Sequence, residues 1–67
     1  MIYHSIMTGS EIIARLKEDG WLLDRVHGSH HIMVKNGIAV PVPVHGKRDV
    51  GAGLQAAIQR QSGIKLK

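Results

Sequence analysis

Two adjacent histidines, His30 and His31, stand in the stretch GSHHIMVKNG, residues 28–37 of this 67-residue chain. Imidazole exchanges a proton near neutral pH, so a histidine can take a proton from a hydroxyl group or return one to a leaving group. An RNA strand supplies its own nucleophile, the 2′-hydroxyl. A single base and a few cations therefore meet the minimum for strand cleavage. The sequence permits His30 to act in this way, with Ser29 donating to a phosphate or holding the ring.

Cations for such a site are close in the sequence. Lys47 and Arg48 follow His45 in a polar connection, residues 45–51, and Lys35 ends the stretch that His30 begins. Lysine and arginine neutralise phosphate charge, so these three side chains are candidate RNA contacts. The alternative is that these residues have no catalytic role. His30 is then an exposed polar residue at the start of a strand, and Lys47 and Arg48 lie in a solvated loop.

Metal chemistry is a weaker interpretation of the histidines. Neighbouring residues of a strand point to opposite faces, so His30 and His31 cannot grip one ion without a bulge. His27, His30 and His45 could converge on one side, but there is no cysteine and no His-x-x-x-His pair on a helix. We therefore expect no native metal site and no cofactor.

The elements that position the histidines begin with a hairpin. The Asn-Gly pair at residues 36–37 tolerates the positive φ of a type I′ turn and predicts two antiparallel strands, residues 30–35 and 38–44. In that register His31 shares a face with the valines of the return strand, and His30 lies on the other face. We expect His31 to be at least partly buried under the helices, and His30 to face solvent.

A third strand is predicted at residues 21–26, directly before the turn glycine Gly28. The return strand carries Pro41 and Pro43, which cannot donate to a ladder, so we expect either an edge position for this strand or prolines that point away from the pairing. Trp21 and Met33 are expected in the core, because a chain with so few aromatic residues is a poor candidate for recognising single strands by stacking.

One helix is predicted before the strands in the sequence and one after them. Residues 8–11, Thr-Gly-Ser-Glu, form a capping box that opens a helix over 9–19, and Gly20 ends it. A second helix is expected over 52–62, ended by Gly63. Its apolar face is expected at Leu54, Ala57, Ile58 and Gln61. The fold class is therefore α+β, in the order α-β-β-β-α, with a three-stranded antiparallel sheet and both helices on one face.

The composition limits the classes of molecule that this chain is expected to bind. The net charge of +4 favours a polyanion, either nucleic acid or an acidic protein. No apolar run is long enough to span a membrane, and residues 1–6 do not resemble a signal peptide, so a cytoplasmic protein is expected. We treat residues 1–7 as an N-terminal extension and 8–67 as one domain, with the first six residues left out of the functional argument.

Four segments in order resemble the HicA toxins of HicA–HicB toxin–antitoxin modules. They are LKEDGW at 16–21, GSHH at 28–31, VPVHGKRDV at 42–50 and IQRQSGI at 58–64. The likeness runs from about residue 8 to 64, and the family has the same α-β-β-β-α order in a double-stranded-RNA-binding-like fold. Two features depart from the family: the extension at residues 1–6, and a short hairpin turn where many relatives carry a longer, more basic connection.

The resemblance implies a small endoribonuclease, an mRNA interferase, that needs no metal and is neutralised by an acidic HicB-type antitoxin. Its functional histidine falls on His30, with Gly28 and Ser29 before it. Some family members keep only the second histidine, so His31 also stays a candidate, and His45 and Lys47 match the family's loop after the third strand. The alternatives are a non-catalytic module for double-stranded RNA, a decayed toxin, and a module that binds only an acidic protein.

Overall fold

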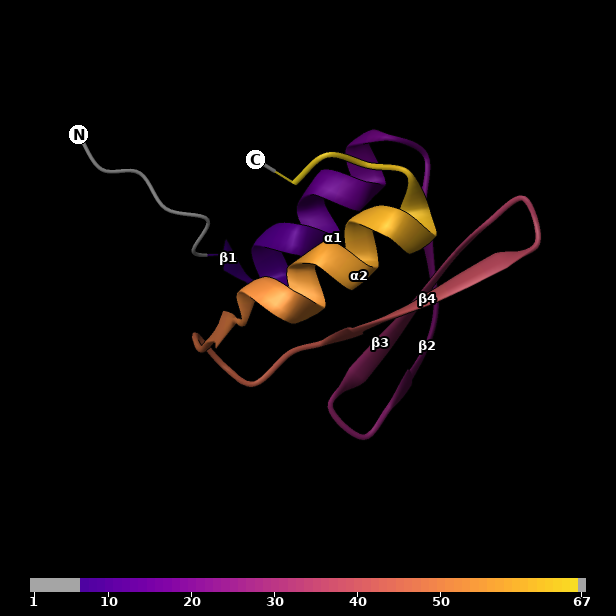
Figure 1. Ribbon diagram of the computed structural model, residues 1–67. Helices are drawn as coiled ribbons and strands as arrows, with labels where there is room; N and C mark the ends of the chain where they lie inside the picture. Colours follow the sequence, from indigo (N-terminus) through magenta and orange to yellow (C-terminus); the bar gives the residue numbers. More distant parts are fainter. Residues whose placement is uncertain (1–6, 67) are drawn as a thin grey trace.

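The computed structural model describes residues 7–66, and its element order is β-α-β-β-β-β-α (Figure 1). The first part of the chain forms β1 (Met7–Thr8), α1 (Gly9–Glu18) and β2 (Leu22–His27). The second part forms β3 (His30–Lys35), β4 (Ile38–Pro43), β5 (Asp49–Val50) and α2 (Ala52–Ser62). The expected α+β class is confirmed. Of the N-terminal extension expected at residues 1–7, residues 1–6 lie outside the described residues, and Met7 belongs to β1.

Both helices pack on one face of a three-stranded antiparallel sheet of order β2-β3-β4, as expected (Figure 1). They lie over β4, and β2 runs along the far edge with all of its residues exposed. Between the helices and the sheet lies one apolar core. Its fully or nearly buried members are Ile12, Leu16, Trp21, Met33, Val40, Val42, Val50, Ile58, Ile64 and Leu66.

The hairpin of β3 and β4 has the predicted register. Asn36 and Gly37 both have positive φ, 50° and 80°, as a type I′ turn requires. His31 lies opposite Val42 and His30 lies opposite Pro43. Since side chains alternate along a strand, His31 shares the helix-covered face with Met33, and His30 lies on the outward face.

The outer edge of β4 is protected by its prolines. The backbone N–H of Val44 donates to the carbonyl of Ser29 at 2.7 Å, which makes residues 29 and 44 a hydrogen-bonded pair. By the alternation of an antiparallel ladder, the nitrogens of residues 41 and 43 then point away from β3. Because both positions are proline, they offer no donor to another strand, and the expected edge position is confirmed.

Helix α1 begins with the predicted capping box. The backbone N–H of Glu11 donates to Thr8 Oγ1 at 3.1 Å, and the N–H of Thr8 donates to Glu11 Oε1 at 2.8 Å. Gly20 follows the helix with φ 95°. The capping box satisfies two backbone donors at the start of α1. That start lies beside the end of β4, where Gly9 is close to the carbonyl of Pro43.

Two features of the fold differ from the sequence-based expectation. The two-residue strands β1 and β5 pair with each other, with Met7 opposite Val50. Residue 7 was expected in the N-terminal extension, and residues 45–51 were expected to form a connection without a strand. The inward face of α2 is also rotated: Ile58 is buried as predicted, but Gln55 is buried while Leu54 and Gln61 are exposed. The Gln55 side chain can be buried because its Nε2 donates to the carbonyl of Val50 at 2.8 Å.

No helix among residues 7–66 is long and apolar enough to cross a membrane.

Candidate functional site

The candidate site lies where β2 turns into β3. Gly28, with φ 64°, and Ser29 form a two-residue turn, so His27 and His30 lie directly opposite each other. On its other side His30 lies opposite Pro43 of β4. Directly opposed residues share a face of the sheet. His27, His30 and Pro43 therefore form a row across the outward face, and both imidazoles are exposed.

A second group reaches this row from the segment after β4. Ser29 Oγ lies 3.4 Å from His45 Nε2, a long hydrogen bond whose direction depends on the histidine tautomer. The two backbones are held in place by the bond from Val44 N–H to the Ser29 carbonyl. The structure thus brings Gly28, Ser29, His30 and His45 together at one end of the sheet.

His31 lies on the other face of β3. It stands between Val26 and Val42 and is partly buried, as predicted. Its Nδ1 is buried and has no hydrogen-bond partner within residues 7–66. The His31 ring therefore lies on the helix-covered side of β3, unlike the exposed ring of His30.

The loop that leads from His45 to β5 carries the nearby positive charge. Lys47 and Arg48 are exposed, and the loop is held by a backbone hydrogen bond from Arg48 N–H to the His45 carbonyl at 3.0 Å. Helix α2 starts directly after this segment. Its N-cap, Gly51, gives it no side-chain cap, and its first turn contains no acidic residue. The positive helix end therefore adds to the field of the loop cations.

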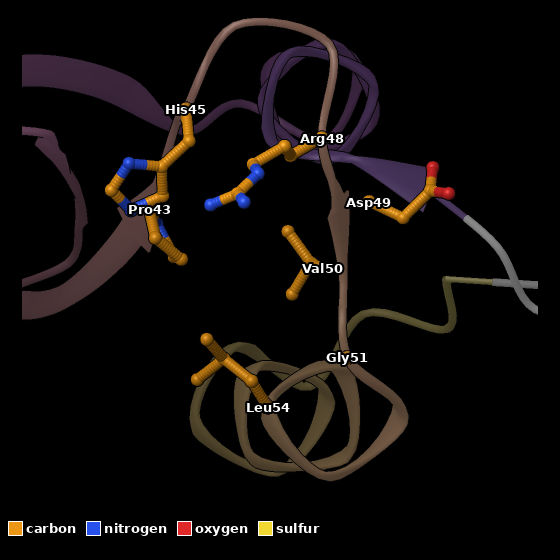
Figure 2. Close-up of a pocket in the computed structure, with 7 residues that line it drawn as sticks. All are labelled: Pro43, His45, Arg48, Asp49, Val50, Gly51 and Leu54. Carbon is orange, nitrogen blue, oxygen red and sulfur yellow. The ribbon is translucent and has the colours of Figure 1, made fainter.

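An open pocket of about 430 Å³ lies between this loop, the end of β4 and the start of α2 (Figure 2). Figure 2 shows the side chains of Arg48, Val50 and Leu54 pointing toward the space that His45 and Pro43 bound on the other side. The carboxylate of Asp49 points away from it. The pocket therefore combines apolar walls with one guanidinium group and one imidazole.

Lys35 is not part of this group. It ends β3, while His30 begins it, and it lies on the helix-covered face. Its Nζ donates to the carbonyl of Asp19 at 2.6 Å and lies 3.3 Å from the Asp19 carboxylate. Asp19 is the C-cap of α1, so the ammonium group stands at the negative end of that helix. The structure gives Lys35 a partner within the fold.

This placement predicts the behaviour of a Lys35→Met variant. We expect a loss of about 0.5–2 kcal/mol in the free energy of unfolding, because an exposed ion pair and a charge at a helix end each contribute up to about 1 kcal/mol. RNA affinity should stay within twofold of the wild type. Urea titration and an RNA-binding measurement on the same preparation test both halves. If RNA affinity fell clearly while stability stayed unchanged, the structural assignment of Lys35 would be wrong and the residue would contact RNA.

Sequence reasoning left two residues out of the site. His27 was considered only as a metal ligand, although a Gly-Ser turn two residues long could have signalled its pairing with His30. Leu54 was assigned to the core by its helical spacing, and only the packing of α2 shows that it lines the pocket. Among residues 7–66, no three histidine or acidic side chains gather as a metal site would require.

Comparison with known proteins identifies the family to which the sequence is similar. Residues 9–64 match the family model described as the HicA toxin of bacterial toxin–antitoxin systems. The chain is also 36% identical, over 59 residues, to a protein named probable mRNA interferase HicA from Pseudomonas fluorescens (strain Pf0-1). That alignment covers 88% of this chain and 98% of the relative.

Proposed function

This chain belongs to the HicA toxin family of bacterial toxin–antitoxin systems, and on that premise we propose that it is an endoribonuclease that cuts mRNA. The observation that supports this activity most directly is the exposed His30 beside Ser29 and His45, at the sheet end next to Lys47 and Arg48. Such a group can move protons and neutralise phosphate without an enclosed cavity, which a domain of this size cannot build.

The proposed reaction joins the 2′-oxygen of RNA to the adjacent phosphorus and breaks the bond from that phosphorus to the 5′-oxygen of the next nucleotide. One proton leaves the 2′-hydroxyl and one joins the departing 5′-oxygen, so a base and an acid are both required. We assign one of these two roles, base or acid, to His30. His45, held by Ser29, takes the other, and the reaction needs no metal ion or cofactor.

The cations of the loop have a separate task. Lys47 and Arg48 are exposed next to His45, and we assign them to the phosphate at which the chain is cut. The negative charge on the phosphorus oxygens grows as the fifth bond forms. Fixed positive groups at that position stabilise the transition state more than the bound substrate.

The proposed partner is an acidic HicB-type antitoxin, and the proposed compartment is the cytoplasm, where message is found. The chain carries 9 lysine and arginine residues against 5 acidic residues, which favours association with an acidic protein. The outward sheet face adds apolar surface beside the histidines: Leu22 is 67% exposed, and Ile32 and Val34 are only partly covered. Such a patch is typical of a protein-binding surface.

The activity is tested with the purified chain and a message transcribed in vitro, in buffer that contains EDTA. We expect fragments, because the proposed chemistry uses only side chains and the substrate's own hydroxyl group. Adding the purified product of a neighbouring small acidic reading frame should suppress them. Binding of the RNA without any cleavage would contradict the proposal and favour a non-catalytic RNA-binding module.

A further inference from the structure

We propose that the pocket beside His45 binds an unpaired nucleobase of the RNA, that of a nucleotide next to the bond that is cut. This inference rests on the proposed endoribonuclease function and deepens it, since it assigns the site a preference for single-stranded substrate. It also gives a task to Leu54, Val50 and Pro43, which the proton-transfer chemistry does not use.

The walls of the pocket suit the flat faces of a base. Leu54 is 42% exposed although it is a large apolar side chain, and it faces Pro43 across the pocket (Figure 2). Val50 lies between Arg48 and Leu54 and points toward the same space. Burying these carbons against a ligand is favourable, and a bare phosphate group would leave them in water.

The polar groups of the pocket suit the rest of a nucleotide. The guanidinium group of Arg48 reaches into the space rather than away from it (Figure 2). A planar guanidinium can stack on a base or hold its phosphate, and histidine rings also stack on unpaired bases. The one carboxylate nearby, that of Asp49, points elsewhere, so no fixed negative charge opposes the phosphate.

The pocket is coupled to the reaction by two residues. Pro43 forms one of its walls and is the direct cross-strand neighbour of His30. His45 forms another wall and contacts Ser29, the residue before His30. A nucleotide whose base enters the pocket therefore lies against His45 and against Pro43, the residue paired with His30.

The consequence is a requirement for unpaired RNA at this position. A base stacked and paired inside a duplex cannot enter a pocket of this kind, and taking it out costs unstacking energy. The chain should therefore cut single-stranded stretches of message, with a base preference set by the pocket walls.

The test is an NMR titration of the full chain with adenosine 5′-monophosphate and, separately, ribose 5-phosphate. The base should make the nucleotide bind about five- to tenfold more tightly than the sugar phosphate, which is the lower part of the range for one stacked base. The amide resonances of Val50, Gly51 and Leu54 should shift. Leu54→Ala should remove most of this advantage, whereas Leu23→Ala, which truncates a leucine on β2 that is also 42% exposed, should retain it.

Equal affinity for the two ligands, or an advantage that Leu54→Ala leaves intact, would overturn the inference. Circular dichroism of each variant confirms that the fold is kept, which the exposure of both leucines leads us to expect. The titration involves no cleavage. A chain that cuts no RNA would refute the proposed function, while a base-independent titration with normal cleavage would refute only the pocket.

Discussion

Replacing His30 with alanine should slow RNA cleavage by about 10²- to 10⁴-fold, the usual contribution of a positioned acid or base. The side chain is exposed on the outward face of β3, so the thermal midpoint should move by little. The wild-type chain and the variant are induced separately in a bacterial host, and growth is followed with the integrity of a reporter message. Cleavage rates of the purified proteins give the magnitude.

The matched control is His31→Leu, one residue further along the same strand. His31 lies on the helix-covered face with its Nδ1 buried and unpaired within the described residues, so leucine removes a polar atom that has no partner. Cleavage should stay within a few-fold of wild type, and the stability should be equal or slightly higher. If the alanine variant at position 30 cut normally and the leucine variant at 31 did not, the assignment of the two histidines would be reversed.

Gly9→Ala should strongly destabilise the fold. A Cβ atom at Gly9 would lie 2.1 Å from the carbonyl oxygen of Pro43 and 2.9 Å from Cγ2 of Val44. The nearer group is backbone, which cannot rotate away, so α1 and the end of β4 must separate. We expect a loss of about 3 kcal/mol or more, a large share of the stability of so small a domain, and a fall of at least about 10 °C in the thermal midpoint.

Gly53→Ala is the matched control for this substitution. Gly53 lies in α2, and a Cβ atom there meets nothing within 4 Å. Alanine should therefore stabilise the helix by about 0.5–1 kcal/mol through its better propensity. Thermal unfolding of the two variants is compared with that of wild type. A Gly9→Ala protein as stable as wild type would be incompatible with the packing of α1 on Pro43.

The close approach at Gly9 also connects the fold to the site. Pro43 is the cross-strand neighbour of His30 and forms a wall of the pocket. A displaced β4 end would therefore change the distance between His30 and the loop that carries His45. Any Gly9→Ala protein that still folds should lose cleavage activity as well as stability, with circular dichroism separating the two effects.

Much of the histidine site could be predicted from local sequence, because turns and alternation are short-range properties. The turn at Asn36 and Gly37 sets the register of β3 and β4, and the period of two then sends His30 outward and His31 toward the core. The capping box at Thr8 and Glu11 likewise needs only neighbouring residues. These predictions are confirmed because no distant contact competes with them.

The rest was decided by contacts between distant segments. A stripe of apolar spacing cannot tell Leu54 from Gln55 as the inward residue of α2, since a buried amide is acceptable only where a carbonyl such as that of Val50 meets it. The pairing of β1 with β5 joins residues more than forty positions apart, and two-residue strands carry no pattern of their own. The ion pair of Lys35 with Asp19 could not be predicted either, because the residues next to Lys35 in the sequence give no sign of this partner.

The sequence by itself thus determined the helices, the three-stranded sheet and the face on which each histidine of the pair lies, because hydrogen bonding and side-chain alternation are local. Only the tertiary structure decided that Ser29 meets His45, that the loop of Lys47 and Arg48 lies beside them, and that Leu54 lines a pocket instead of the core. Those positions depend on how the helices pack over β4, where close contacts such as that of Gly9 with Pro43 select one arrangement.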